Sequence, residues 1–470
     1  MDRRKFFKIG SVATVGTGLL YPLNGISKTF DTPTYSNRTP KNIIVMVSDG
    51  MSSGTLSMTD IFLSRKFGKP SNWMSLYQEN KVSRALMDMA SANSIVTDSA
   101  AASSSWGSGH RVRNGSVNIG ANKEEYTPIW LKFKKAGKKA GCVTTVAITH
   151  ATPAGFMANS SKRNAQEDIA QQYLERGFDV LMGGGDNFFN SEKRKDKQDL
   201  YTQYKNKGYQ IAKSKAELKN INSNAPVLGI FADDALSYSI DRMSDKELEH
   251  KTPTLAEMSA KAIEVLSQSK NGFVLQIESG KVDWAAHAND LGGLIHEQIA
   301  FDETIKVVMD FAEKDKETLV IITTDHGNAN PGIIYGRNAN DNFDSVQKYT
   351  QTNEWILNSF SEKSSVKNII ETVEYANGNI LSDEDAQKIL AYYSNLEKSE
   401  DGLYNYRKLP FKTFAEIQSK TNSVGWISMD HSADYVELAM FGPGSENLKP
   451  FIKNTDLHYF MLEAAKVSVE

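Results

Sequence analysis

The stretch that decides the fold is Asn42-Ile43-Ile44-Val45-Met46-Val47-Ser48-Asp49-Gly50. Its first part, Asn42 to Val47, is a short apolar run rich in β-branched residues, which is typical of a strand buried on both faces of a parallel sheet. The run stops at Ser48-Asp49-Gly50, and Asp and Gly favour the corner at which a strand turns toward a helix. A buried strand that ends in a polar corner predicts an α/β unit.

Alternation of strands and helices continues along the chain. Further strand-like runs are Val143 to Ile148, Val180 to Met182, Phe273 to Ile277, Leu319 to Thr323 and Tyr435 to Phe441. Helical patterns cover Ile129 to Lys135, Ala165 to Glu175, Ala256 to Ser267, Ala285 to Ala312 and Leu457 to Lys466. This order predicts an α/β fold, a three-layer α/β/α sandwich with a mostly parallel central sheet.

Two segments depart from this pattern. Asn328 to Val424 is polar and charged with few strand-like runs, which predicts an inserted helical region forming a lid or crown. No site residue is expected from this region. Its aromatic residues are interpreted as local core: Tyr335, Tyr349, Trp355 and Phe360. The Lys-rich stretch from Ser191 to Asn224 is expected to be a surface excursion.

The N-terminus is predicted to lie outside the fold. Arg3-Arg4-Lys5-Phe6-Phe7-Lys8 precedes an apolar, Gly-rich run from Ile9 to about Leu23, which is the order of a cleavable export signal. The paired arginines resemble a twin-arginine signal, and a disordered basic tail is the alternative. We expect a signal over residues 1–25, no stable membrane span after processing, a Ser/Thr/Pro-rich linker over 26–40, and a periplasmic or secreted protein.

The bulk composition argues against some partners. The formal net charge of the 470 residues is −3, and removing residues 1–25 takes away four positive charges and one negative, which leaves −6. This balance gives no support for nucleic acid or an anionic membrane as a partner. Cys142 is the single cysteine, so no intrachain disulfide can form.

Acidic and imidazole side chains stand at the ends of several predicted strands: Asp49, Glu278, Asp283, His287, Asp325, His326 and His431. Ligands bind beyond the carboxyl ends of the strands in such sheets, so these side chains are expected to meet at one edge. Histidines with several carboxylates suit zinc, and sets of oxygen ligands suit magnesium.

Each of these positions also has a plainer interpretation. Asp49-Gly50 and Asp325-His326-Gly327 are ordinary turn sequences. Asp283 and His287 are four residues apart, a spacing found in surface pairs on helices as well as in metal sites. A lone His431 is more often structural. The convergence of all these corners on one pocket favours a site.

The stretch Val96-Thr97-Asp98-Ser99-Ala100-Ala101-Ala102-Ser103 has two interpretations. As a helix start, it uses Asp98 or Ser99 to cap free N–H groups. As a reactive site, it presents Ser99 as a nucleophile, because the N–H donors and positive potential of a helix N-terminus suit an alkoxide and a bound phosphate.

Taken together, the motifs resemble those of the alkaline phosphatases. The matching stretches, in family order from about residue 41 to the C-terminus, are Asp49-Gly50-Met51, Thr97 to Ala101, Thr152-Pro153-Ala154, Glu278 to His287, Thr324 to Gly327 and His431 to Ala433. The resemblance implies a catalytic domain over residues 41–470, with the insertion at about 328–424, that hydrolyses phosphate monoesters through a covalent phosphoserine at Ser99. It also implies two zinc ions, one magnesium ion and a possible homodimer.

The resemblance distributes the zinc ligands by position. Asp283, His287 and His431 are expected to hold the zinc that activates the hydrolytic water. Asp325, His326 and Asp49 are expected to hold a second zinc, which also binds Ser99.

The remaining positions concern magnesium and phosphate. Asp49 is expected to bridge to a magnesium ion completed by Thr152 and Glu278. Arg163, which fits the family spacing better than its neighbour Lys162, is expected to grip two phosphate oxygens with its planar fork.

His150 and Trp284 mark variation within the family, because the best-known bacterial form has an aspartate and a lysine there. His150 has two interpretations. Either it is linked to the third metal and alters the binding of that ion, or it contacts the metal ligands without binding a metal itself. Trp284 is expected to contact substrate without supplying a charge, so Arg163 bears more of the phosphate binding.

Other functions were weighed against this interpretation. A sulfatase is disfavoured because Ser99 is followed by Ala100 rather than by a Cys/Ser-x-Pro-x-Arg motif. A metal-dependent mutase and a phosphodiesterase are further alternatives. A phosphodiesterase can share the two-zinc site but usually lacks the third metal, so the Thr152 and Glu278 pair favours monoesters. A metal-loaded binding protein without turnover would lack a ligand or the nucleophile, and every position is filled.

Overall fold

The structure is a computed structural model that describes residues 38–398 and 402–469. The predicted signal over residues 1–25 lies outside the described residues, as does most of the predicted linker, so both stay predictions. Across the described ranges, no helix combines the length and the apolar character needed to cross a membrane.

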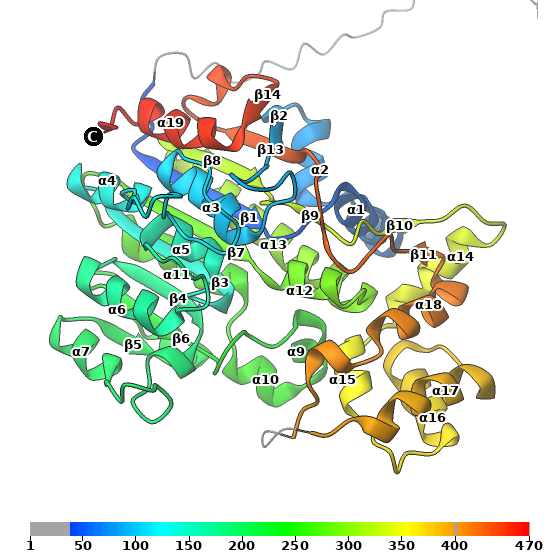
Figure 1. The fold of residues 1–470 in the computed structure, drawn as a ribbon. Helices are drawn as coiled ribbons and strands as arrows, with labels where there is room; N and C mark the ends of the chain where they lie inside the picture. Colours follow the sequence, from blue (N-terminus) through cyan, green and yellow to red (C-terminus); the bar gives the residue numbers. More distant parts are fainter. Residues whose placement is uncertain (1–37, 399–401, 470) are drawn as a thin grey trace, which may run out of the picture. The chain divides into compact units, whose positions relative to one another are not determined.

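A ten-stranded sheet forms the centre of the fold, with the order β14-β2-β13-β8-β1-β7-β3-β4-β6-β5 (Figure 1). Its strands are β1 (Asn42–Ser48), β2 (Ser83–Asp88), β3 (Lys139–Ala147), β4 (Val180–Gly184), β5 (Gln210–Ala212), β6 (Val227–Ile230), β7 (Phe273–Ser279), β8 (Thr318–Thr323), β13 (Val436–Phe441) and β14 (Phe451–Lys453). Only β13 pairs antiparallel with its neighbours, β2 and β8, among the described strands of this sheet. The prediction of a mostly parallel α/β sheet is confirmed.

Both faces of the sheet are buried, as the apolar run at Asn42 predicts. On β1, Ile44 and Met46 join one apolar core, whereas Ile43, Val45 and Val47 join a second core on the opposite face. Because successive side chains of a strand point to opposite faces, one continuous apolar run can fill two cores.

Helices cover the two faces. Those that contribute to the core of Ile44 are α1 (Ser53–Phe67), α2 (Asn72–Gln78), α8 (Lys215–Lys219), α9 (Ser239–Ser244), α11 (Leu255–Leu266), α12 (Lys281–His287) and α13 (Leu291–Asp315). Those that contribute to the core of Val45 are α3 (Ser99–Ser108), α4 (Ile129–Lys135), α5 (Ala151–Met157), α6 (Gln166–Arg176), α7 (Leu200–Asn206) and α19 (Asn454–Ala464). The exposed α10 (Lys246–Lys251) and the short turn Asp186–Phe188 complete this part. The Thr254 and Glu257 capping box starts α11 as predicted.

The prediction of one continuous helix over Ala285 to Ala312 is wrong. The chain forms α12 and α13 instead, separated at Asn289, whose φ is 46°. The Asp290 side chain accepts a hydrogen bond from the Gly293 N–H at 2.9 Å and so caps the second helix. Apolar periodicity carries across such a break, which is why the pattern conceals it.

Strands that the sequence analysis missed lie toward the edges of the sheet: β2, β5, β6 and β14. In β2 only Ala85 and Met87 are buried, because an outer strand keeps one face polar. The stretch predicted as a surface excursion contributes β5 to the sheet, and it also holds Arg194, which is 1% exposed. That prediction is therefore wrong in part.

The segment between β9 (Gly327–Asn328) and β12 (His431–Ser432) is mostly helical, and Figure 1 draws it in yellow and orange. It holds β10 (Gly332–Ile333), α14 (Ala339–Asp344), α15 (Asn353–Asn358), α16 (Val366–Asn377), α17 (Asp383–Leu390), α18 (Phe411–Asn422), β11 (Val424–Gly425) and short turns at Ser345–Lys348, Ala391–Asn395 and Tyr406–Lys408. Helices α15 to α18 share a third apolar core, which includes Phe360 and Tyr393. We call this segment the helical segment.

Candidate metal and phosphate site

The order of the central strands explains how distant residues meet. β8, β1, β7 and β3 are neighbours in the sheet and run parallel. Asp49 follows β1, Glu278 ends β7, and Asp325 follows β8. Because parallel strands end at the same edge, these carboxyl groups gather there.

Gly50 makes the close approach of two of these corners possible. Its φ of 67° favours glycine, and a Cβ at this position would lie 2.5 Å from Oδ1 of Asp283. The Gly50 N–H also donates to Asp325 Oδ1 at 3.0 Å. The absence of a side chain at Gly50 therefore lets the backbone of the corner after β1 approach Asp283 and Asp325 closely.

One cluster of ligand atoms consists of Asp283, His287 and His431. The two histidine Nε2 atoms lie 3.1 Å apart, and the Asp283 oxygens lie 3.4 Å from His287 Nε2 and 3.6 Å from His431 Nε2. Asn328 donates to Asp283 Oδ1 at 2.7 Å and fixes this carboxylate.

The other nitrogen of each ring faces a backbone carbonyl. His287 Nδ1 lies 2.6 Å from the Met429 oxygen, and His431 Nδ1 lies 2.9 Å from the Thr97 oxygen. A carbonyl accepts only, so Nδ1 carries the proton and the Nε2 lone pairs point at each other. This arrangement is the one in which histidines bind a metal ion.

A second cluster consists of Asp49, Asp325 and His326, which are 1% exposed or less. His326 Nε2 lies 3.5 Å from Asp49 Oδ1 and 3.3 Å from Asp325 Oδ2. Asp325 Oδ2 has no hydrogen-bond partner within the described residues. Buried polar atoms are normally paired, so this oxygen has capacity for a cation.

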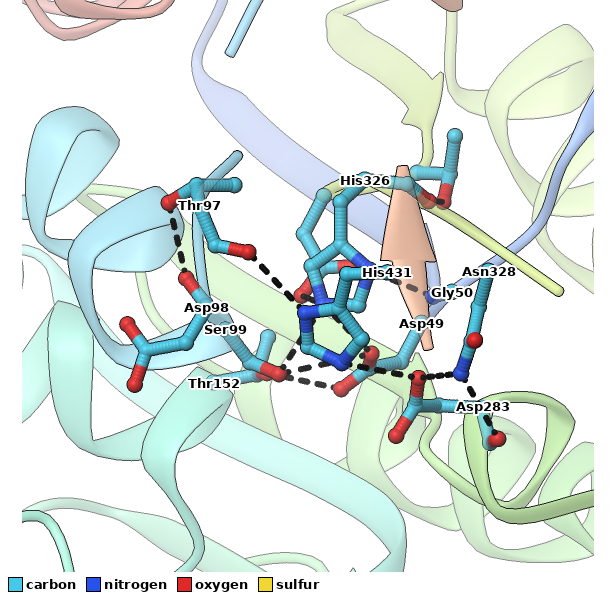
Figure 2. Close-up of polar contacts among 12 residues, drawn as sticks. Asp49, Gly50, Thr97, Asp98, Ser99, Thr152, Asp283, His326, Asn328 and His431 are labelled. Atoms are coloured by element: carbon cyan, nitrogen blue, oxygen red, sulfur yellow. Dashed lines mark hydrogen bonds and ion pairs between the residues drawn. The ribbon is translucent and has the colours of Figure 1, made fainter. Parts of the chain in front are cut away.

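Ser99 adjoins the second cluster. It is the first residue of α3, and its hydroxyl oxygen lies 3.3 Å from His326 Nε2 and 3.5 Å from Asp49 Oδ1 (Figure 2). The cap is Asp98, whose side chain accepts from the Ala101 N–H at 2.9 Å. Because the cap and the inward hydroxyl belong to adjacent residues, Ser99 is free of the capping role that the sequence left open.

A third cluster consists of Asp49, His150 and Glu278. Thr152 donates to Asp49 Oδ2 at 3.1 Å, and Thr144 donates to Glu278 Oε2. Glu278 Oε1 and His150 Nδ1 have no hydrogen-bond partner within the described part of the chain. Asp49 thus joins the second and third clusters through its two oxygens.

Burial sets the protonation of these carboxyls. It raises the pKa of Glu278 to about 7 and that of Asp325 to about 6. Burial and repulsion from Asp325 and Asp283 raise the pKa of Asp49 well above its usual value. Burial also acts to raise the pKa of Asp283, but the positive charge of the neighbouring histidines in their protonated form outweighs it and holds that pKa at about 2. So many buried carboxylates need positive charge to stay ionised.

Ser99, Asp283, His287 and His431 open onto a cavity of about 750 Å³, whose inner part is also lined by Arg163. Arg163 Nη1 donates to Asp98 Oδ2 at 3.1 Å, and its Nη2 lies 3.3 Å from His150 Nε2. The neighbouring Lys162 is exposed. We call one region of this site the floor of the cavity. It consists of the strand corners that carry the three clusters and of the start of α3.

His150 and Trp284 also line this cavity, with their rings edge to face at a centroid distance of 6.3 Å. Burial lowers the pKa of His150 to about 3, and the positive charge of Arg163 adds to the effect. His150 is therefore a neutral imidazole beside the guanidinium.

The outer part of the cavity comes from the helical segment, from which no site residue was expected. The cavity is lined there by Glu354, Tyr406, Arg407, Leu409 and Phe411, which we call the wall. None of the four aromatic residues named from the sequence lines the cavity. Their interpretation as local core is confirmed for Tyr349 and Phe360, which are buried, and is wrong for Tyr335, which is fully exposed, while Trp355 is partly exposed.

Two residues that orient side chains of this site were not predicted from the sequence, namely Asp98 and Asn328. Asp98 was considered only as a cap, although it pairs with Arg163. Asn328 was assigned to the insertion, yet it holds Asp283. The position of Asn328 directly after Asp325-His326-Gly327 was a usable signal, whereas nothing in the sequence marked the wall.

Clusters of carboxylates and imidazoles around a serine at the carboxyl edge of a parallel sheet define a class of metal-dependent α/β hydrolases. Comparisons with known proteins then identify the family: the sequence profile described as "Alkaline phosphatase" matches residues 40–467, and the chain belongs to the alkaline phosphatase family.

Several relatives support this assignment. Alkaline phosphatase 4 of Bacillus subtilis is 32% identical over 426 residues, which cover 88% of this chain and 87% of that protein. The crystal structure of Thermus thermophilus alkaline phosphatase superposes with a TM-score of 0.84 at 30% identity, covering 96% of each chain. A cold-active alkaline phosphatase from Shewanella sp. shares the fold, with a TM-score of 0.76 at 24% identity over 90% of this chain and 99% of that one. The chain is a phosphoric monoester hydrolase of this family.

Proposed function

We propose that the chain hydrolyses phosphate monoesters through a covalent phosphoserine at Ser99, on a floor that holds two zinc ions and one magnesium ion. The observation that carries this proposal is the position of the Ser99 hydroxyl. It lies at a helix N-terminus, within 3.5 Å of both Asp49 and His326, and it lines the cavity. A hydroxyl that served only the helix would have no reason to point into a cluster of ligand groups.

The donor sets fit these ions. Asp283, His287 and His431 would hold one zinc ion, and Asp49, Asp325 and His326 would hold the other, since both sets combine imidazole nitrogen with carboxylate oxygen.

Asp49, Thr152 and Glu278 would hold magnesium through oxygen atoms. The orphaned oxygens Glu278 Oε1 and Asp325 Oδ2 support this fit, because a bound cation would satisfy each of them. His150 adds a nitrogen beside this oxygen set.

When bound, the ions would lower the pKa of the serine hydroxyl, activate the hydrolytic water and neutralise the charge of the phosphoryl group. Ser99 attacks phosphorus, so that an Oγ–P bond forms while the bond to the leaving oxygen breaks and the alcohol departs with a proton. In the second step a water oxygen attacks the same phosphorus, which restores the Ser99 hydroxyl and releases inorganic phosphate. Division into two displacements lowers the barrier of each.

The chain's own groups orient these steps. The free N–H groups at the start of α3 stabilise negative charge on the phosphoryl oxygens. Arg163 supplies two N–H donors in a plane, and its pairing with Asp98 directs that fork into the cavity. His150, neutral and beside the same guanidinium, limits where the fork can move.

The proposal is tested by the Ser99→Ala variant with elemental analysis of its metals. We expect hydrolysis of a phosphate monoester to fall by at least about 10³-fold, because the alanine cannot accept the phosphoryl group, while zinc and magnesium content stays close to that of the wild type. Ser57→Ala, at an exposed serine of α1, serves as the matched control.

Equal turnover by Ser99→Ala and wild type would refute the covalent route. Fewer than two zinc ions per fully active chain would refute the metal assignment. A phosphate diester assayed in parallel decides the substrate class, since faster turnover of the diester would favour a phosphodiesterase.

Two other expectations remain predictions. Export to the periplasm or the medium rests on residues 1–25, outside the described range. A homodimer rests on the resemblance to the family.

A further inference from the structure

The space beside the wall is a part of the cavity that the phosphoryl group does not occupy. The cavity of about 750 Å³ extends from Ser99 and Arg163 to Tyr406, Leu409 and Phe411. A phosphoryl group needs only the floor, so the remaining space is available to the alcohol portion of the ester.

The inner side of this space is aromatic. Trp284 lines the cavity together with Asp283, and its ring centroid lies 6.3 Å from that of His150 beside the floor. The Tyr406 hydroxyl donates to the Trp284 carbonyl oxygen at 3.0 Å and ties the wall to α12. The Tyr406 and Phe411 rings pack with centroids 4.7 Å apart, which continues the aromatic surface outward.

The wall is held in place before any ligand binds. Phe411 and Leu409 are 2% and 7% exposed and belong to the third apolar core, against which Tyr406 also packs. The Phe411 N–H donates to the Leu409 carbonyl at 2.9 Å. A preformed aromatic surface binds flat rings at low entropic cost.

The charges around this surface select against a second anion. Glu354 and Asp430 both line the cavity outside the floor, while Arg163 is committed to the phosphoryl group. Arg407 lines the outer part as an exposed cation. Because Glu354 and Asp430 outnumber Arg407, this part of the cavity repels an alcohol portion that carries its own negative charge and does not repel an uncharged ring.

We infer that Trp284, Tyr406 and Phe411 form a leaving-group subsite for phosphate monoesters whose alcohol carries a flat, uncharged aromatic ring close to the ester oxygen. The inference rests on the proposed function, because it places the phosphoryl group at Ser99 and Arg163.

Non-hydrolysable phosphonates test the subsite without depending on the covalent step. The inhibition constants of methylphosphonate, 1-naphthylphosphonate and inorganic phosphate are measured for the metal-loaded wild type. We expect 1-naphthylphosphonate to bind about tenfold more tightly than methylphosphonate. An aromatic contact together with burial of the ring contributes about a tenfold gain in affinity.

Variants then show which side chains cause the preference for 1-naphthylphosphonate over methylphosphonate. Tyr406→Ala and Phe411→Ala are expected to reduce the naphthyl-to-methyl ratio to about threefold or less. Tyr406→Phe keeps the ring and is expected to preserve the ratio. Tyr335→Ala, at a tyrosine that is fully exposed and outside the cavity, is the matched control. The inhibition constant of inorganic phosphate is expected to stay unchanged throughout, because the floor is untouched.

An equal affinity of the wild type for both phosphonates would overturn the inference, as would an unchanged ratio in Tyr406→Ala. Tyr406→Ala keeps the test valid if Phe411→Ala does not fold. The proposed function fails by a different result, namely retained turnover in Ser99→Ala. The two failures are therefore distinguishable.

Discussion

The floor and the wall of one cavity are built in opposite ways. Floor residues stand at the ends of adjacent parallel strands, and their partners are fixed by the sheet: Asp49 after β1, Glu278 on β7 and Asp325 after β8. Wall residues come from the helical segment, which packs around an apolar core of its own. The floor is dense with titratable groups, whereas the wall combines the buried Leu409 and Phe411 with the more exposed Tyr406 and Arg407.

This difference separates chemistry from selection. A group that must hold an ion or a nucleophile within a few tenths of an ångström needs rigid support from strands. A surface that chooses between alcohols can belong to an appended segment, because a change there leaves the floor intact. The two regions should therefore respond differently to perturbation.

Removal of metal should have the largest effect. Treatment with a chelator is expected to abolish phosphomonoesterase activity, because Ser99 then lacks the positive charge that activates it, and zinc with magnesium should restore it. Rebinding is followed by titrating zinc and magnesium into the metal-free protein.

The rebinding should depend on pH with a defined sign. Metal ions bind ionised carboxylates, so protons compete below the raised pKa values of Glu278, about 7, and Asp325, about 6. Affinity is expected to level off about one unit above pH 7 and to fall as the pH drops through 7 toward 5, with protons released on binding. Calorimetry in two buffers of different ionisation enthalpy measures that release, and an affinity independent of pH would contradict the described floor.

Loss of the phosphate fork should have the next largest effect. Arg163→Ala is expected to lower kcat/KM by about 10³-fold, since two charge-assisted hydrogen bonds to the phosphoryl group are lost, with a smaller loss in Arg163→Lys. Lys162→Ala, at the exposed neighbour, is the control and should change little. Similar losses in the Arg163 and Lys162 variants would show that general positive charge, not the fork, binds phosphate.

A void created by mutation in the apolar core of the helical segment should have the smallest effect on phosphomonoesterase activity. Phe360 is 1% exposed in the third apolar core, and Phe360→Ala is expected to destabilise the helical segment by about 3–5 kcal/mol, measured by denaturant unfolding. Metal content and inhibition by inorganic phosphate should stay as in the wild type. Phe67→Ala, at a largely exposed phenylalanine, is the matched control. Loss of metal from Phe360→Ala would mean that floor and wall are not separable.

The sequence was informative where one strong physical signal dominated. The apolar run at Asn42 predicted a strand buried on both faces, and the polar corners that follow the central strands predicted the edge of the sheet at which the carboxyl and imidazole groups meet. Strand β2, which lies next to the edge strand β14, was missed because its polar residues weaken the apolar pattern. The break at Asn289 was missed because apolar periodicity continues through it.

The wall could not be predicted for a different reason. Tyr406 and Phe411 carry no spacing that distinguishes them from Tyr349 or Phe360, which are core residues. Their position over the cavity depends on how the helical segment packs on α12, through contacts such as that between the Tyr406 hydroxyl and the Trp284 carbonyl. Such long-range contacts leave no local pattern.

The central claim is that Ser99 becomes covalently phosphorylated during turnover. Rapid acid quench of the metal-loaded enzyme with a phosphate monoester, followed by peptide mass spectrometry, tests it directly. The account predicts a phosphoryl group on Ser99 alone, absent from the Ser99→Ala variant. Phosphate on another residue, or rapid turnover with no phosphopeptide in the quenched sample, would contradict it.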